Sequence, residues 1–273
     1  MTKPKTCSPI RKTKGQKNTS TDNSANPRTT DILAMNIREK FFERINQDFE
    51  VLSKIVIQQI NQTARLLDDN SDPELYTEID NTERIIDSLD VKLRNEVINV
   101  IVLYSPRATD LRKIMSYYDM TAYLERIGDL LMNIRRFMQQ IDLKGAVFPH
   151  FHADLSKLLS SAENMTQNAI FAFTCQDNKL AKDTIDLDDM VDTLHHDIIR
   201  RLRGYGNQTL KEQHLTDILC LSGISYNIER IGDNATNIAE AAIYLMEGKN
   251  IKHRENEGKD ILMAGSEGEM RDQ

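Results

Sequence analysis

Tryptophan is absent from the sequence, and aromatic residues make up only 6% of it. A hydrophobic core must therefore be built mainly from aliphatic side chains. The sequence also lacks an uninterrupted apolar run of the roughly 20 residues that a membrane-spanning helix needs. Its basic N-terminal stretch has no apolar segment of the kind found in a secretory signal. We therefore expect a protein that does not insert into a membrane.

Cysteine is also scarce. The three cysteines (Cys7, Cys175 and Cys220) lie far apart and form no CxxC pair, so closely spaced zinc ligands are not indicated. This pattern suits the reducing cytoplasm, which is the expected localisation. The sequence contains no P-loop, no dinucleotide-binding fingerprint and no Ser/His/Asp arrangement. It therefore predicts a protein that is not an enzyme.

Charge is distributed unevenly along the chain. Residues 1–30 contain seven Lys or Arg and one Asp, so the remaining residues carry 28 basic and 41 acidic groups, a net charge of −13 against −7 for the whole chain. An acidic body disfavours nucleic-acid binding and favours cations. We expect residues 1–35 to form a disordered basic tail and residues 249–273 a polar C-terminal tail, because neither has apolar periodicity.

An internal duplication is the most informative pattern. The motif ERIGDxxxNI begins at Glu125 and again at Glu229, 104 residues later. Other matches keep nearly the same offset; for example, Asp87-Ser88-Leu89 corresponds to Asp192-Thr193-Leu194 at 105 residues. Such self-similarity indicates two similar structural units. We place repeat one at 36–145 and repeat two at 146–248, each the size of a small helical domain.

Apolar residues recur at spacings of three and four, which predicts helices. Proline 106 is expected in the first turn of the third helix, where its missing N–H does no harm. The predicted fold is all-α, with two pseudo-symmetric antiparallel three-helix bundles joined by a loop at 145–149. The six long helices are expected at about 37–67, 74–103, 105–141, 151–175, 179–203 and 210–248.

Pairs of carboxylates at i and i+4 occur in four of these helices. In the third and sixth helices the pairs follow the duplicated motif and lie away from the apolar stripe. In the second and fifth helices a pair flanks the stripe. Each repeat therefore offers two acidic pairs from two neighbouring helices: Glu83/Asp87 with Glu125/Asp129, and Asp188/Asp192 with Glu229/Asp233.

These rows carry an electrostatic cost. Like charges at i and i+4 destabilise a helix by a few tenths of a kcal/mol, and two adjacent rows add to the repulsion. Either neighbouring arginines or bound cations would compensate, and carboxylate-only sites suit Mg²⁺, Mn²⁺, Ca²⁺ or iron. The alternative is that the rows are ordinary solvated helix faces. Gly128 and Gly232, between the paired carboxylates, would permit close helix approach or ligand access.

The residues that carry these features resemble the PhoU family, the accessory regulators of the bacterial phosphate-specific transport system. The resemblance covers about residues 36–248. It rests on the two ERIGD motifs with their flanking residues, 124–129 and 228–240, and on the PxAxDLR element that begins at Pro106. Family members often have an acidic residue two positions before the motif's glutamate, where this chain has Tyr123 and Asn227.

The resemblance implies a negative regulator of phosphate-starvation signalling that bridges the ATPase of a phosphate ABC transporter and a sensor histidine kinase. It also implies multinuclear clusters of divalent or trivalent metal ions, such as iron, zinc, manganese or magnesium. We expect a homodimer that binds no nucleic acid. Carried over by position, the metal ligands would be Glu83, Asp87, Glu125, Asp129, Asp188, Asp192, Glu229 and Asp233.

Two other functions are compatible with long acidic helices. One is a metal-free helical adaptor. The other is a ferritin-like carboxylate-bridged metal oxidase, which needs Glu-x-x-His on facing helices. Gly128 and Gly232 stand where that histidine would be in the duplicated motif. A carboxylate and a histidine have this spacing only once in the relevant rows, at Asp192 and His195, and we expect His195 and His196 at the surface.

Overall fold

The computed structural model describes residues 29–206 and 212–248, and every regular element in these ranges is a helix. The chain divides into two compact units, Met1–Arg44 and Ile45–Gln273. In the first unit, the described residues form the first part of α1 (Thr29–Asp68). All features discussed below lie in the second unit. The expected C-terminal tail and most of the expected N-terminal tail lie outside the described residues.

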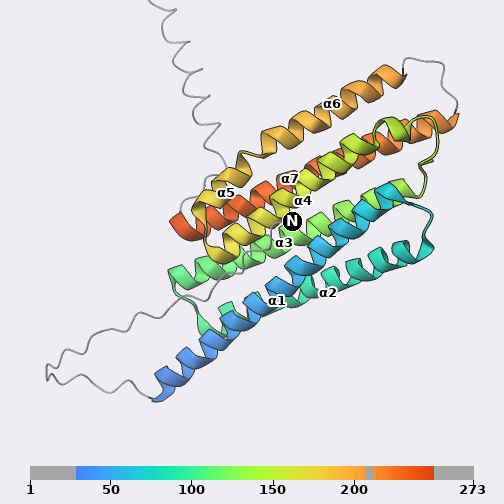
Figure 1. Cartoon of the computed structure of the whole chain (residues 1–273). Helices are drawn as coiled ribbons and strands as arrows, with labels where there is room; N and C mark the ends of the chain where they lie inside the picture. Colours follow the sequence, from blue (N-terminus) through green and yellow to red (C-terminus); the bar gives the residue numbers. More distant parts are fainter. Residues whose placement is uncertain (1–28, 207–211, 249–273) are drawn as a thin grey trace, which may run out of the picture. The chain divides into compact units, whose positions relative to one another are not determined.

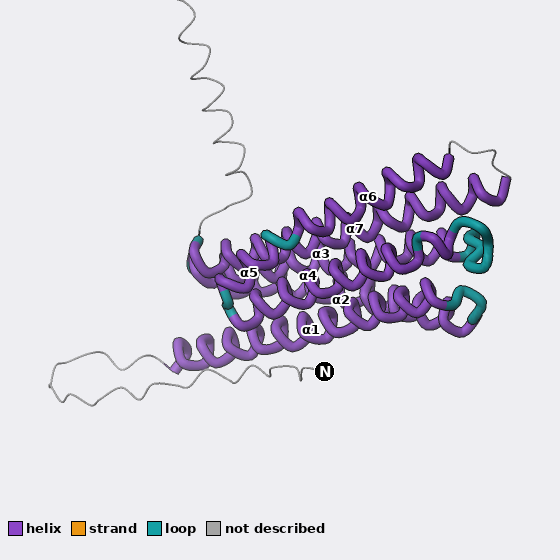
Figure 2. The backbone as a smooth tube through the Cα atoms, turned by 45° about the horizontal axis from the view of Figure 1, so that its top comes forward, coloured by secondary structure: helices purple, strands orange, loops and turns teal. Residues whose placement is uncertain are grey.

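The all-α prediction is confirmed for the described ranges (Figures 1 and 2). None of the helices in these ranges is both long enough and apolar enough to cross a membrane. After α1, the elements are α2 (Pro73–Tyr104), α3 (Ala108–Met138), a short 3₁₀ helix η1 (Phe148–His150), α4 (His152–Cys175), α5 (Asn178–Ile185), α6 (Asp188–Gly206) and α7 (Glu212–Glu247).

The ends of α2 follow from local chemistry. Asp72 caps the N-terminus by accepting a hydrogen bond from the backbone N–H of Glu74 at 2.9 Å, and Pro73 occupies the first turn. Ser105 ends the helix in a left-handed conformation, with φ of 43°. The prediction that Pro106 lies in the first turn of α3 is wrong. Ser105 closes α2 and α3 begins only at Ala108, so the proline lies in the short connection between them.

The helix expected at 179–203 is divided into α5 and α6 by a break at Asp186 and Leu187. At the break, the backbone N–H of Leu187 donates to the carbonyl of Thr184 at 3.2 Å, a tighter turn than that of an α-helix. The break makes Asp188 the first residue of α6. Its carboxylate therefore lies at a helix N-terminus, where the helix dipole favours negative charge.

The two repeats pack together through α3 and α7. Helix α3 lies against α2 and α7, and α7 also lies against α4, α5 and α6 (Figure 1). The predicted apolar stripes form this core, because Ile127, Leu131, Ile224 and Ile231 are fully buried. One of the few aromatic contacts, between Tyr117 and Phe173 with ring centroids 5.0 Å apart, joins α3 to α4.

Helices α3 and α7 run antiparallel and approach closely. Asn133 on α3 donates to Asn227 on α7 at 3.2 Å, and one turn further along α3 the ring of Phe137 lies over Gly223. A Cβ atom on Gly223 would lie only 2.5 Å from Cζ of Phe137. The absence of a side chain at Gly223 is therefore what allows the phenyl ring to pack directly against the α7 backbone.

We expect Gly223→Ala to destabilise the protein by about 1–3 kcal/mol, because overpacking forces the Phe137 ring and the helices apart. The matched control is Gly204→Ala in α6, since a Cβ on Gly204 would meet no atom within 4 Å. The control should stabilise the protein by up to about 1 kcal/mol through helix propensity alone. Urea unfolding of both variants measures the difference. Equal stability of the two variants would refute the close-packing argument.

Candidate metal centre

The first carboxylate cluster consists of Glu83 and Asp87 on α2 and Glu125 and Asp129 on α3. Glu83 Oε2 lies 3.0 Å from the point that a Cβ atom on Gly128 would occupy. The Glu83 carboxylate therefore approaches α3 at Gly128, the glycine between the two motif carboxylates. Burial and, to a smaller extent, the charges of the other three carboxylates raise the pKa of Glu83 to about 7. The pKa of Glu125 is raised by burial and then by Asp129.

A glutamine on α1 completes this cluster. Gln59 is fully buried, and its Nε2 donates to Glu83 Oε2 at 2.6 Å, which lowers the pKa of Glu83 in part. No motif or repeated pattern in the sequence points to Gln59. Ser53, Gln62 and Thr63 of the same helix are also polar and buried, so Gln59 does not stand out within the apolar stripe. At the corresponding place in repeat two, 103 residues later, stands Ala162, so the second cluster lacks this hydrogen bond.

The second carboxylate cluster consists of Asp188 and Asp192 on α6 and Glu229 and Asp233 on α7. Burial raises the pKa of Asp188 to about 6 and that of Glu229 to about 7, and the charge of Asp233 contributes to both. Asp233 itself has a pKa raised by burial and by Asp192. The sequence-derived pairs are therefore electrostatically coupled across neighbouring helices in both repeats.

Arginines partly compensate the second cluster. The pKa of Asp233 is lowered by Arg230 of its own helix and by Arg126. Arg126 belongs to the motif of the other repeat, on α3. The two ERIGD motifs thus meet at the α3–α7 contact, where the arginine of one motif acts on the carboxylate of the other.

A histidine distinguishes the second cluster from the first. His195 is half-buried, and its Nδ1 lies 2.9 Å from Ser225 Oγ on α7, one turn before Glu229. Its neighbour His196 is exposed, as expected, whereas His195 was also expected at the surface and is instead partly covered by α7 through Ser225. The corresponding residue of repeat one is Asp90, which pairs with Arg94 at 2.6 Å. The second cluster therefore has an imidazole where the first has a carboxylate already held by an arginine.

The residues fit a cation in charge and in chemistry. Glu229 Oε2 is buried and accepts no hydrogen bond from the described residues; Asp188 Oδ1 is also buried and meets no partner in good hydrogen-bond geometry, although Thr236 lies near enough to lower the pKa of Asp188 in part. Oxygen donors of this kind bind hard and borderline cations. A cation would also relieve the mutual repulsion that raises the pKa values. Within the described ranges, however, no three Asp, Glu, His or Cys side chains converge closely enough to hold one metal ion. Binding of one ion by three or more of these side chains would therefore require side-chain rotation.

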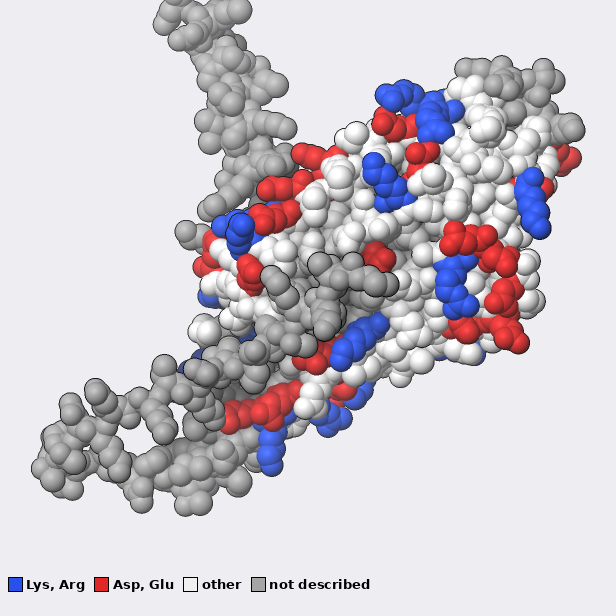
Figure 3. Space-filling model, in the orientation of Figure 1, with Lys and Arg blue, Asp and Glu red and all other residues white. Residues whose placement is uncertain are grey.

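The face visible in Figure 3 carries acidic side chains interspersed with basic ones over the described part of the chain. No continuous basic surface covers this view. A nucleic-acid site would present clustered Lys and Arg. The visible face therefore gives no support to nucleic-acid binding.

Comparison with known proteins identifies relatives of the whole helical body. A family model described as the PhoU domain matches residues 49–138 and, a second time, residues 155–242. Among curated proteins, a phosphate-specific transport system accessory protein PhoU homolog of Aquifex aeolicus is 33% identical over 79% of this chain and 95% of its own length. A homolog with the same description from Zymomonas mobilis is 31% identical over 71% of this chain and 79% of its own length.

Solved structures share the fold. The crystal structure of PhoU from Pseudomonas aeruginosa superposes with a TM-score of 0.72 at 27% identity, covering 77% of this chain and 99% of that one. A phosphate transport system regulatory protein PhoU from Streptococcus pneumoniae gives a TM-score of 0.69 at 19% identity, covering 79% of this chain and 99% of that one, and shows the similarity of fold. The two helical repeats are thus found along nearly the whole length of both structures.

Proposed function

The chain belongs to the PhoU family, and we propose that it is a negative regulator of phosphate uptake and phosphate-starvation signalling that binds its partner proteins in a metal-dependent manner. Family membership makes it an accessory and regulatory protein of phosphate transport, without catalytic turnover. The proposed partners are the ATPase of a phosphate ABC transporter and a sensor histidine kinase. We propose that it acts as a homodimer.

The proposal of metal-dependent binding rests on one arrangement of carboxylates that occurs in both repeats. Each repeat places two carboxylate pairs on neighbouring helices, and in each a mid-helix glycine leaves room where the pairs meet. The proposed ligands are those of the two clusters: Glu83, Asp87, Glu125 and Asp129, and Asp188, Asp192, Glu229 and Asp233. A bound cation would supply the positive charge that these carboxylates lack and an attachment point for an anionic group.

The charge of the protein makes such a cation useful. An acidic body repels phosphate and acidic protein surfaces unless a cation intervenes. None of the eight carboxylates is fully buried, so an ion held by them would be accessible to a partner. Gln59 would hold Glu83 in place in the first cluster, while Arg126 and Arg230 would offset part of the charge in the second.

A metal-free helical adaptor is the second candidate. It is favoured by the finding that no three potential ligands converge in the described ranges. Elemental analysis of the full-length protein, purified without chelators, separates the two candidates. Stoichiometric iron, zinc, manganese or magnesium supports the metal-dependent function, whereas metal-free protein that still binds its partners supports the adaptor.

The regulatory assignment is tested in cells. Deleting the gene should make phosphate-starvation genes active even in phosphate-rich medium, because a negative regulator is lost. Expression of the intact chain should restore repression. Reporter expression is measured in high and low phosphate in each strain. Normal phosphate-responsive expression in the deletion strain would show that the regulatory assignment is wrong.

A further inference from the structure

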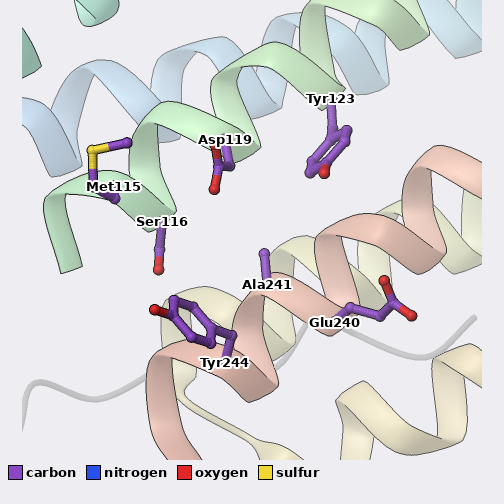
Figure 4. Close-up of a pocket in the computed structure, with 7 residues that line it drawn as sticks. All are labelled: Met115, Ser116, Asp119, Tyr123, Glu240, Ala241 and Tyr244. Carbon is purple, nitrogen blue, oxygen red and sulfur yellow. The ribbon is translucent and has the colours of Figure 1, made fainter. Parts of the chain in front are cut away.

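A cavity of about 270 Å³ lies between α3 and α7, and none of the carboxylates of the two clusters lines it (Figure 4). In Figure 4, Asp119 and Tyr123 project from α3 toward α7, and Ala241 projects from α7 toward α3. We call this cavity the α3–α7 pocket. Its lining residues are Met115, Ser116, Asp119, Tyr123, Glu240, Ala241 and Tyr244.

The duplication explains why the pocket exists. An offset of 104 residues relates Phe137 to Ala241 and Asp119 to Gly223. The pocket is thus the counterpart of the place where Phe137 packs against Gly223. There, an aromatic ring fills the space between the helices and nearly touches the α7 backbone. In the pocket, the corresponding side chain is only the methyl group of Ala241, so the space remains open.

The two places also differ in polarity. At the filled place, Asn227 donates to the carbonyl of Gly223 at 2.7 Å and accepts from Asn133 at 3.2 Å, so the polar groups are neutral and paired. At the open place, the lining includes two carboxylates, Asp119 and Glu240, and the phenol rings of Tyr123 and Tyr244. In Figure 4 the carboxylate of Asp119 projects toward α7, whereas that of Glu240 is directed away from Tyr244. Aromatic faces next to carboxylates are the usual surroundings of an organic cation.

One guanidinium already lies at the edge of the pocket. Arg112 is stacked over the ring of Tyr244, with its Cζ 5.8 Å from the ring centroid. Besides Arg112 at its edge, the charged side chains that line the pocket are Asp119 and Glu240. Asp119, Tyr123 and Glu240 each take part in a further interaction, which an incoming group would have to join or replace.

We propose that the α3–α7 pocket receives an arginine side chain of a partner protein. A guanidinium can stack on the tyrosine rings and donate to the carboxylates at the same time, which the point charge of lysine cannot do as well. The available volume suits one long side chain, as the phenyl ring at the counterpart position indicates. The proposal does not depend on metal at the carboxylate clusters.

The test uses the full-length protein, treated with a chelator, and two small probes. N-acetyl-arginine methylamide carries the guanidinium, and N-acetyl-citrulline methylamide has nearly the same shape without the charge. Binding is followed by NMR titration, with chemical-shift changes mapped to the lining residues. We expect the arginine probe to bind at least about tenfold more tightly than the citrulline probe, which corresponds to about 1.4 kcal/mol.

Two variants and one control localise the binding. Asp119→Asn removes one charge with little change of shape, and Ala241→Phe fills the space as Phe137 does at the counterpart place. Both substitutions should lower the affinity for the arginine probe at least about tenfold. The control, Asp183→Asn, removes an exposed carboxylate from α5 and should have no effect. Equal binding of both probes, no binding by the wild type, or full binding by Asp119→Asn would overturn the proposal.

Discussion

Replacing Glu125, Asp129, Glu229 and Asp233 together with alanine should yield a folded, fully helical protein that no longer retains metal. These side chains are only partly buried and lie off the apolar stripes of α3 and α7. Their removal should therefore leave the core intact, and relief of charge repulsion should stabilise the metal-free helices by a few tenths of a kcal/mol per pair. Metal content by elemental analysis and helicity by circular dichroism are the two measurements.

A matched variant controls for the change in net charge. Replacing four exposed carboxylates outside the clusters removes the same number of charges and should leave metal content unchanged. Full metal content in the cluster variant would exclude the motif carboxylates as the main ligands. Loss of metal in both variants would show a general effect of charge rather than specific ligation. The control positions are Glu74, Glu78, Asp183 and Glu212.

The carboxylate pairs could be found in the sequence because their signal is periodic and repeated. A spacing of four residues places both carboxylates on one side of a helix. The offset of about 104 residues then identifies the equivalent helix in the other repeat. The amphipathic stripes were equally visible, and residues such as Ile127 and Ile231 are indeed fully buried. Local and repeated patterns of this kind are therefore sufficient to predict most of the helices and their buried faces.

Features without a repeated signal could not be predicted. Gln59 contacts Glu83 from a third helix, and its counterpart in repeat two is Ala162, so the duplication gave no indication of its role. The break between α5 and α6 is a single tight turn within an otherwise helical pattern. The α3–α7 pocket arises from the exchange of Phe137 for Ala241 across the antiparallel contact, which is evident only when the register of α3 and α7 is known.

The metal-free protein should be more stable at about pH 5 than at about pH 8. Glu83 and Glu229 each have a pKa raised from 4.5 to about 7 in the folded state, and Asp188 has a pKa raised from 3.8 to about 6. A carboxyl whose pKa is higher in the folded than in the unfolded protein binds more protons when folded. Its stabilising effect is therefore full below the unfolded pKa and is lost as the pH rises through the folded pKa.

Partial exposure limits the size of the effect. Solvent screening should reduce each contribution to about 1 kcal/mol, less than the full shifts would give. Urea unfolding of chelator-treated protein across this pH range measures how steeply the free energy of unfolding changes with pH. Glu83→Gln should flatten this dependence, because the amide does not titrate, whereas the control Glu78→Gln on an exposed face of α2 should not.

Metal should reverse the sign of this pH dependence. A cation binds the deprotonated carboxylates, so its stabilising effect grows as the pH rises through the same range. In saturating Mn²⁺, the protein should therefore be more stable at about pH 8 than at about pH 5, the opposite of the metal-free protein. If Mn²⁺ leaves the slope unchanged while the metal-free slope is as expected, the carboxylates are coupled by burial and repulsion alone. The clusters would then be acidic faces of a metal-free adaptor.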